Sequence, residues 1–165
     1  MSEWFRKNAG VVVFNKHKKV LLCKRVDVAN SWQFPQGGIE ENESPSEAGK
    51  RELFEETSIK SVELIKTLAN PVRYYFTPEI IASMKKRGFT NSGQDIYWSL
   101  FYFYGDETEI NLQTEHPEFV EFKWGTLAEA EKLIVEFKKQ AYVVAKEEFE
   151  EIIARHEIRW LILFI

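Results

Sequence analysis

The chain has 165 residues, a formal net charge of −4 and an aromatic content of 15%. This length fits one domain with a substantial buried core, so we expect residues 1–165 to form a single domain. Residues 1–35 hold seven Lys and Arg against two acids, whereas residues 106–137 hold nine acids against two Lys. This distribution excludes the broad basic surface of a protein that grips many nucleic-acid phosphates.

The single cysteine and the N-terminus bear on the cellular compartment. Cys23 has no partner for an internal disulfide, and its apolar neighbours indicate a buried structural thiol rather than a nucleophile. Residues 1–6 lack the apolar segment of a secretory signal peptide. We therefore expect a reducing compartment and a cytoplasmic location.

Two β-strands are predicted near the N-terminus, over residues 8–15 and 19–25, where β-branched and aliphatic runs flank a polar turn. Arg6 precedes the first strand, and Arg25 ends the second. Each arginine carries a planar guanidinium group that suits phosphate oxygens. Both are therefore candidate substrate-binding residues, although an ordinary exposed arginine is the alternative interpretation.

A helix is predicted to follow, from about Pro45 to Thr57. Ser44 and Glu47 have the spacing of a capping box, in which the serine is the N-cap and the glutamate reaches back to it. Pro45 takes the first helical position, where the missing N–H costs nothing. The start of this helix is therefore specified by three neighbouring residues.

Three glutamates of the predicted helix, Glu52, Glu55 and Glu56, lie within one third of its circumference. The like-charged pair at i and i+4 costs an isolated helix roughly 0.2–0.5 kcal/mol. A divalent cation would remove that cost, and oxygen ligands suit a hard ion such as magnesium. Arg51 is placed to pair with Glu47 and Glu55, four residues to either side. A solvated acidic face is the alternative interpretation.

The remaining elements follow from periodicity and turn residues. Residues 94–104 are apolar on both alternating faces, which is typical of a central strand covered on both sides. Residues 85–93 carry basic side chains and two glycines, and we interpret them as a loop that is either solvated or in contact with substrate. The other predicted elements are a strand over 61–68 and helices over 78–87, 126–135 and 141–156.

The segment from Gly37 to Ile59 resembles the Nudix box, which runs glycine, any five, glutamate, any seven, then Arg-Glu-aliphatic-any-Glu-Glu-any-glycine-aliphatic. The matching residues are Gly37, Glu43, Arg51, Glu52, Leu53, Glu55, Glu56 and Ile59. Ser58 replaces the last glycine of the motif. Such a glycine ends the helix in a left-handed conformation, which serine adopts less readily, so the local geometry there is open.

Residues 32–38, with the sequence WQFPQGG, narrow the resemblance within the Nudix superfamily. They resemble the bacterial RNA pyrophosphohydrolases and the plant-type diadenosine tetraphosphate hydrolases, two closely related groups. The resemblance covers about residues 4–149. It implies an α+β fold, an α/β/α sandwich with a mixed β-sheet. It also implies cleavage of a nucleoside diphosphate linked to another group, with magnesium or manganese.

The resemblance implies a role for each residue of the acidic cluster. The metal ligands would be the backbone carbonyl of Gly37 and the carboxylates of Glu52, Glu55, Glu56 and Glu118. Glu52 and Glu118 are the two candidates for the base that takes a proton from water, and Arg51 would steady the cluster. His116, beside Glu118, is interpreted as a loop residue, because a water activated by a metal needs no histidine.

The resemblance also implies contacts with the substrate. Phe137 would stack on a base, and Lys138 and Tyr142 would approach phosphate. Gln94 is retained from a Gly-Gln-Lys-Gln-Lys-Trp segment of these relatives, but Asp-Ile-Tyr replaces Lys-Gln-Lys at residues 95–97. Two positive charges are lost there, so the preferred phosphate count and the substrate are open.

The leading functional prediction is magnesium-dependent removal of pyrophosphate from the 5′ end of triphosphorylated RNA. The same motifs support hydrolysis of dinucleoside polyphosphates, such as diadenosine tetraphosphate, or of free nucleoside di- and triphosphates. A nucleotide-binding regulator without turnover is the non-enzymatic alternative, and the intact carboxylate set argues against it. The expected partners are an RNA 5′ end or a nucleotide, with Mg²⁺ or Mn²⁺ as the cofactor.

The apolar C-terminal tail, residues 160–165, is not explained by the resemblance. Six apolar residues are far too few to cross a bilayer, which takes about 20. We expect no membrane span, and we expect the tail to dock on the domain or on a second subunit. Oligomerisation through the tail is therefore an open alternative.

Overall fold

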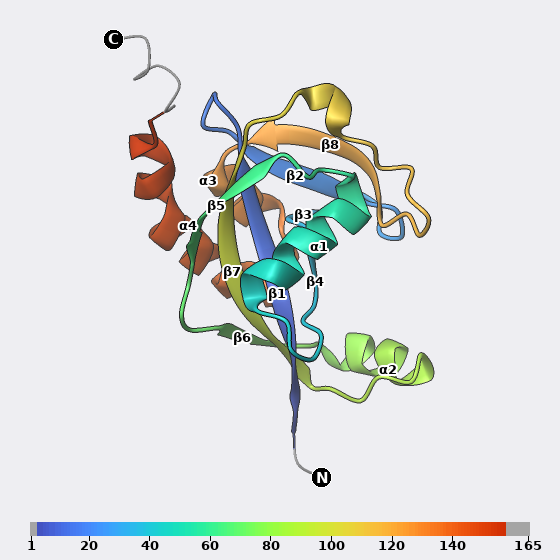
Figure 1. Cartoon of the computed structure of the whole chain (residues 1–165). Coiled ribbons are helices and arrows are strands. Elements are labelled where there is room, and N and C mark those ends of the chain that lie inside the picture. The colour runs from blue at the N-terminus through green and yellow to red at the C-terminus, as the bar shows by residue number, and fades with distance from the viewer. Residues whose placement is uncertain (1–2, 158–165) are drawn as a thin grey trace, which may run out of the picture.

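The computed structural model describes residues 3–157, which form a mixed β-sheet with helices on both faces (Figure 1). The strands are β1 Phe5–Phe14, β2 Val20–Arg25, β3 Trp32–Gln33, β4 Gln36–Gly38, β5 Val62–Thr67, β6 Val72–Tyr75, β7 Gly93–Phe103 and β8 Phe119–Gly125. The α-helices are α1 Pro45–Thr57, α2 Pro78–Lys86, α3 Leu127–Leu133 and α4 Lys139–Arg155, with short 3₁₀ turns η1 Glu107–Glu109 and η2 Glu136–Lys138. This arrangement confirms the predicted α+β sandwich.

The long strands β1 and β7 run parallel at the centre of the sheet, in the order β3-β2-β1-β7-β5. Antiparallel partners complete it, with β4 on β1, β6 on β7 and β8 on β2. Strand β1 pairs with β4 along residues 8–10 and with β2 only at Phe14. Strand β4 therefore pairs with the part of β1 that β2 leaves unpaired, and the chain runs from β4 into α1.

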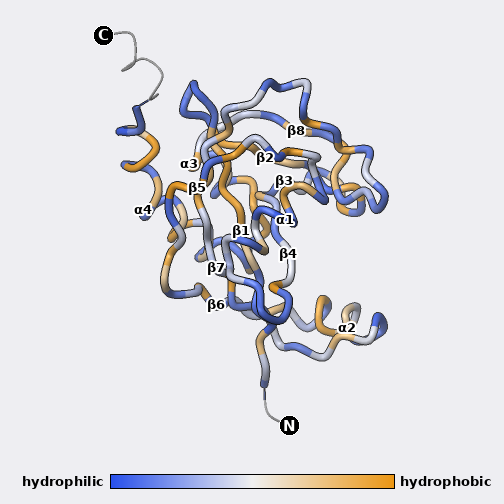
Figure 2. Tube along the Cα trace, viewed as in Figure 1, coloured by the Kyte–Doolittle hydropathy of each residue, from blue (hydrophilic) through white to orange (hydrophobic). Residues whose placement is uncertain are grey.

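Two apolar clusters fill the spaces between the sheet and the helices. The first packs Trp98, Tyr142 and Phe149 between the sheet and α4, and the indole N–H of Trp98 donates to the Ala141 carbonyl at 3.1 Å. The second includes Leu53 of α1 on the opposite face. Figure 2 shows hydrophobic residues along β1 in the centre and hydrophilic residues in the turns that project outward.

The predicted elements are confirmed, with ends that move by a few residues. The strand expected at 94–104 is β7, and its side chains are buried on both faces along most of its length. The predicted helices correspond to α2, α3 and α4. Cys23 is fully buried, as its apolar neighbours predicted. The tail at 160–165 lies outside the described residues. No helix among residues 3–157 is long and apolar enough to span a membrane.

Candidate active site

Helix α1 begins with the predicted capping box. The Ser44 hydroxyl accepts a hydrogen bond from the Glu47 backbone N–H at 3.2 Å, and the Glu47 carboxylate accepts one from the Ser44 backbone N–H at 3.3 Å. These bonds satisfy two N–H groups that would otherwise lack partners at the helix start. The capping box therefore fixes where α1 begins, seven residues after the end of β4.

The end of α1 shows how Ser58 replaces the glycine of the motif. Ser58 adopts the left-handed conformation, with φ of 68°, and its N–H donates to the Phe54 carbonyl at 2.8 Å. Its hydroxyl also donates to the Asn111 carbonyl at 2.9 Å. The serine therefore keeps the geometry of a glycine C-cap, and its side-chain hydrogen bond offsets part of the conformational cost.

Arg51 organises the acidic residues around the helix. Its guanidinium donates to the Glu43 carboxylate at 2.8 and 3.0 Å, to Glu52 at 2.8 Å and to Glu55 at 3.3 Å. The predicted pairing with Glu55 is confirmed, but the predicted pairing with Glu47 is wrong, because that carboxylate caps the helix. The Arg51 hydrogen bonds, together with one from a backbone N–H, lower the pKa of Glu43 to about 2.

Gly37 and Gly38 allow two charged side chains to approach the backbone closely. A Cβ at Gly37 would collide with the carboxyl group of Glu52, and a Cβ at Gly38 would collide with the guanidinium of Arg6. The positive charge of Arg6 also acts on Glu52, although burial is the largest influence and leaves the pKa of Glu52 raised. Glu52 and Arg6 therefore each lie close to the backbone of one glycine of β4.

Glu56 is the most deeply buried carboxylate of the cluster, with 7% of the residue exposed. Its Oε2 atom has no hydrogen-bond partner among the described residues. Burial raises the pKa of Glu56 well above its usual value, and the negative charges of Glu52, Glu118 and Glu55 raise it further. A buried, incompletely paired carboxylate is unfavourable on its own, so this site is suited to a cation.

Glu118 lies in the loop before β8 and completes the acidic group. Its backbone carbonyl accepts a hydrogen bond from the Val26 N–H at 2.9 Å, which holds this loop against the end of β2. Its charge is one of those that raise the pKa of Glu56. The structure therefore brings together Glu118 and α1, which are far apart in the sequence.

A cleft of about 690 Å³ contains this acidic group. Its lining residues are Glu52, Phe54, Glu55, Glu56, Ser58, Thr114, Glu115, His116 and Glu118. His116 lies in a loop, as predicted, and this loop lines the cleft. Thr114 was missed, and its buried hydroxyl has no hydrogen-bond partner among the described residues. Nothing in the local sequence marks these residues, because a long loop carries them to the cleft.

The carboxylates are not arranged as a finished chelate. No group of three His, Cys, Asp or Glu side chains within residues 3–157 stands in a metal-binding arrangement. The Glu52 carboxylate accepts a hydrogen bond from the Arg51 guanidinium at 2.8 Å, while Oε2 of Glu56 has no partner among the described residues. The residue types and the unpaired oxygen nevertheless fit a hard divalent ion.

Beside the cleft, Gln36 connects strands from distant parts of the chain. Its amide nitrogen donates to the side-chain oxygens of Asn8 at 3.0 Å and Gln94 at 3.2 Å. Its amide oxygen accepts from the Lys138 ammonium group at 3.4 Å. Tyr74 donates to Gln94 and closes the network. Gln94 is therefore a buried member of a network that positions Lys138.

Lys138 and Arg25 lie close to each other at this edge of the site. Lys138 is 7% exposed, and its burial, followed by the charge of Arg25, lowers its pKa to about 8. The lysine is therefore mostly charged at neutral pH and loses its charge as the pH rises through about 8. Arg25 donates two hydrogen bonds to Asp27, at 2.9 and 2.7 Å.

Two aromatic residues predicted to contact substrate pack against other rings in the structure. Tyr142 is only 2% exposed, its hydroxyl accepts from the Phe34 N–H at 2.8 Å, and its ring stacks on Phe34 at 4.8 Å. It is too buried to approach a phosphate, so that prediction is wrong. Phe137 is partly buried and packs against Tyr74 at 5.8 Å and Phe76 at 6.2 Å. Stacking of Phe137 on a base stays a prediction.

The unusual residues 95–97 have structural partners of their own. Asp95 accepts two hydrogen bonds from Arg73, at 2.8 and 3.0 Å, so its negative charge is neutralised by a neighbouring strand. Ile96 is fully buried. Residues 95 and 96 therefore have structural roles: Asp95 forms an ion pair with Arg73, and Ile96 belongs to the core.

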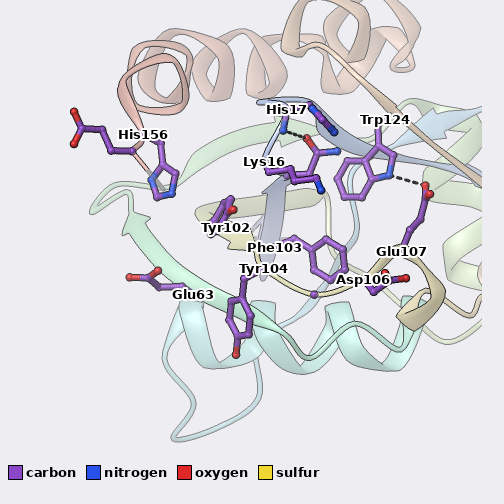
Figure 3. A pocket seen from close by; sticks show the side chains of 13 residues that line it. Lys16, His17, Glu63, Tyr102, Phe103, Tyr104, Asp106, Glu107, Trp124 and His156 are labelled. Carbon is purple, nitrogen blue, oxygen red and sulfur yellow. Dashed lines mark hydrogen bonds between the residues drawn. The ribbon is translucent and has the colours of Figure 1, made fainter. Parts of the chain in front are cut away.

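A second cavity, of about 650 Å³, lies where the β1–β2 turn meets the ends of β7 and α4 (Figure 3). Aromatic side chains line it, together with charged groups: Tyr102, Phe103, Tyr104, Trp124, His156, Lys16, His17, Glu63, Asp106 and Glu107. None of the predicted site residues is among them. The acidic cleft, and not this cavity, is the candidate active site.

Known proteins share both the sequence and the fold. A family model described as NUDIX domain matches residues 4–146. The chain is 41% identical over 149 residues to an RNA pyrophosphohydrolase of Pelagibacter ubique, covering 90% of this chain and 93% of that protein. It is 40% identical over 144 residues to the chloroplastic Nudix hydrolase 26 of Arabidopsis thaliana, covering 85% of this chain and 67% of that protein.

A solved structure adds a likeness in fold. The E. coli dihydroneopterin triphosphate pyrophosphohydrolase superposes with a TM-score of 0.66 and 22% identity, covering 85% of this chain and 95% of that one. The chain belongs to the Nudix hydrolase family, as the motif predicted. Enzymes of this family generally use divalent metal ions.

Proposed function

We propose that this chain is a magnesium-dependent RNA pyrophosphohydrolase, which releases pyrophosphate from 5′-triphosphorylated RNA in the cytoplasm. The observation that carries the proposal is the buried carboxylate of Glu56, whose Oε2 atom has no hydrogen-bond partner among the described residues and which lies among the charges of Glu52, Glu55 and Glu118. Relatives at 36–42% identity that are named RNA pyrophosphohydrolase support the choice of substrate.

The acidic cleft would hold magnesium through oxygen ligands. These are the Gly37 carbonyl and the carboxylates of Glu52, Glu55, Glu56 and Glu118. Bound magnesium supplies positive charge that stabilises the phosphate oxygens and makes water a better nucleophile. Arg51 would keep the cluster in place, because it contacts Glu43, Glu52 and Glu55 at once.

A carboxylate of the cleft would take the proton of the attacking water. Glu52 and Glu118 are the two candidates, since both lie beside Glu56 in the same cleft. The water attacks phosphorus, the bond to the bridging oxygen breaks, and pyrophosphate leaves from RNA that retains a 5′ monophosphate. The reaction needs no covalent intermediate on the protein.

The basic residues around the cleft would orient the phosphate chain. Arg6 lies against Gly38, and Arg25 and Lys138 lie together on the other side of Gln36. Positive groups held in fixed positions stabilise the charge that develops in phosphoryl transfer. The hydrogen bonds of Gln36 and Gln94 hold Lys138 in place, so these amides would act by positioning.

Replacement of Arg25 by alanine should mainly weaken substrate binding. Loss of a charged hydrogen-bond donor to phosphate should raise KM about tenfold, with kcat changed by about twofold or less. Steady-state kinetics with 5′-triphosphorylated RNA would measure both constants. Arg155→Ala, which removes an exposed arginine paired with Glu151 on α4, is the matched control. An unchanged KM for Arg25→Ala would remove Arg25 from the proposed site.

A comparison of substrates tests the proposal directly. Triphosphorylated RNA, diadenosine tetraphosphate and free nucleoside triphosphates would be offered separately under identical magnesium concentrations. The proposal predicts the highest kcat/KM for RNA. Cleavage of the dinucleotide or the free nucleotides with RNA left untouched would refute it. Tight nucleotide binding without any phosphate release would instead support the non-enzymatic alternative, a nucleotide-binding regulator.

A further inference from the structure

A small basic surface lies at the end of α2 and in the loop that follows it. Lys85, Lys86 and Arg87 are exposed, and none of them forms an ion pair with a carboxylate among residues 3–157. Helix α2 contains no buried residue and projects from the sheet near the N-terminal end of β1 (Figure 1).

Phe89 connects this basic surface with the candidate active site. The guanidinium of Arg87 lies 5.8 Å from the centre of the Phe89 ring, and the guanidinium of Arg6 lies 5.7 Å from it. Arg6 is the same side chain that lies against Gly38, and its charge acts on Glu52. Arg6 and Phe89 therefore link the end of α2 with β4, the strand that precedes α1.

Trp4 belongs to the same surface. It is 46% exposed, and its indole N–H donates to the Thr90 hydroxyl at 3.1 Å. Its backbone carbonyl accepts from the Ser92 N–H at 2.9 Å. Because these bonds tie the loop after α2 to the beginning of β1, the exposed indole is held beside the loop that carries Phe89.

The charge of Arg87 also acts on the loop between β2 and β3. The pKa of Asp27 is lowered, first by its hydrogen bonds from Arg25 and, as a smaller contribution, by the charge of Arg87. Arg87 therefore lies within electrostatic reach of the loop between β2 and β3.

We infer that this surface, formed by Trp4, Arg6, Lys85, Lys86, Arg87 and Phe89, binds the single-stranded RNA chain that follows the 5′ phosphates. Single-stranded nucleic acid is bound by positive groups that follow its backbone and by aromatic rings on which its bases stack. The surface has both kinds of group, and it begins at Arg6. The inference rests on the RNA function proposed above and extends it, because it specifies a substrate several nucleotides long.

Binding of product RNA tests this inference without turnover. The probe is fluorescent single-stranded RNA with a 5′ monophosphate, from a dinucleotide to about 12 nucleotides. The triple variant Lys85→Ala/Lys86→Ala/Arg87→Ala should bind the longest RNA about tenfold more weakly, and the loss should shrink as the RNA shortens. The slope of log Kd against log salt concentration should fall by about 2, since three charges are removed.

Matched variants test whether RNA binding depends on this surface or only on the total positive charge of the protein. Lys16→Ala/Lys19→Ala/Lys66→Ala removes three exposed lysines from the β1–β2 turn and β5, away from α2 (Figure 1). It should bind the longest RNA as wild type does. Lys85→Ala/Lys86→Ala keeps the C-cap residue Arg87 in case the triple variant does not fold. Phe89→Ala should weaken binding, and Phe89→Tyr should retain it.

Two results would overturn the inference. One is an equal loss in both triple variants, and the other is a loss in the α2 variant that does not depend on RNA length. A failure of the proposed function is distinguishable, because it appears in the turnover of triphosphorylated RNA by the wild-type protein. Length-dependent binding that the α2 variant loses would support the surface even if no pyrophosphate were released.

Discussion

Glu56→Gln should abolish nearly all turnover and leave the fold intact. The substitution preserves size but removes the negative charge of the buried carboxylate whose Oε2 is unpaired. We expect kcat to fall by about 10³-fold, which corresponds to about 4 kcal/mol of lost transition-state stabilisation. Glu55→Gln should lose nearly all turnover as well. Rates of pyrophosphate release from triphosphorylated RNA would measure the effect.

A control variant on the same helix distinguishes the loss of a charge in the cleft from the loss of a charge elsewhere on α1. Glu47→Gln also removes one glutamate charge from α1, but Glu47 caps the helix, and glutamine serves equally well at this capping position. This variant should keep wild-type turnover. Circular dichroism would check the fold of every variant. Near wild-type turnover in both Glu55→Gln and Glu56→Gln, with unchanged spectra, would remove these residues from the reaction.

The second large effect is a stabilisation by magnesium that depends on pH and requires Glu56. The pKa of Glu56 is raised in the folded protein, mainly by burial. The folded state therefore binds a proton more tightly than the unfolded state does. The resulting stability is fully present below the unfolded pKa and is lost as the pH rises through the folded pKa. A cation that pairs with the carboxylate restores stability on the alkaline side.

Thermal unfolding with and without magnesium would measure this coupling. At a magnesium concentration about 100 times Kd, the gain of about 2.7 kcal/mol should raise Tm by about 5–10 °C. The shift should be larger at pH 8 than at pH 5. Glu56→Gln should lose most of the shift and should be more stable than wild type at pH 8 without metal. An equal shift in the variant would contradict the assignment of Glu56.

Local signals in the sequence specified α1 and its carboxylates well. The capping box of Ser44 and Glu47 fixed the start of the helix, and its period placed Glu52, Glu55 and Glu56 together. For Arg51, spacing correctly predicted the contact with Glu55 but wrongly predicted one with Glu47. A further partner, Glu43, lies outside the helix in a turn, where its N–H donates to the Glu40 carbonyl at 3.1 Å. Helical periodicity cannot indicate such a contact.

Contacts between distant segments account for most of what the sequence did not predict. Gln36 contacts Asn8, Gln94 and Lys138, which come from three other parts of the chain. Tyr142 occurs in a segment typical of nucleotide contacts, but α4 turns it toward Phe34 and into the core. The orientation of such a residue depends on packing between elements, and a pattern within one element does not determine it.

The most direct test of the account is to identify the products formed from 5′-triphosphorylated RNA with magnesium. Wild-type protein should yield one pyrophosphate for each RNA that retains a 5′ monophosphate, and a chelator should stop the reaction. Glu56→Gln should yield almost none. RNA that stays intact while free nucleotides are cleaved, or equal release in the presence of the chelator, would contradict metal-assisted RNA pyrophosphohydrolysis by this cleft.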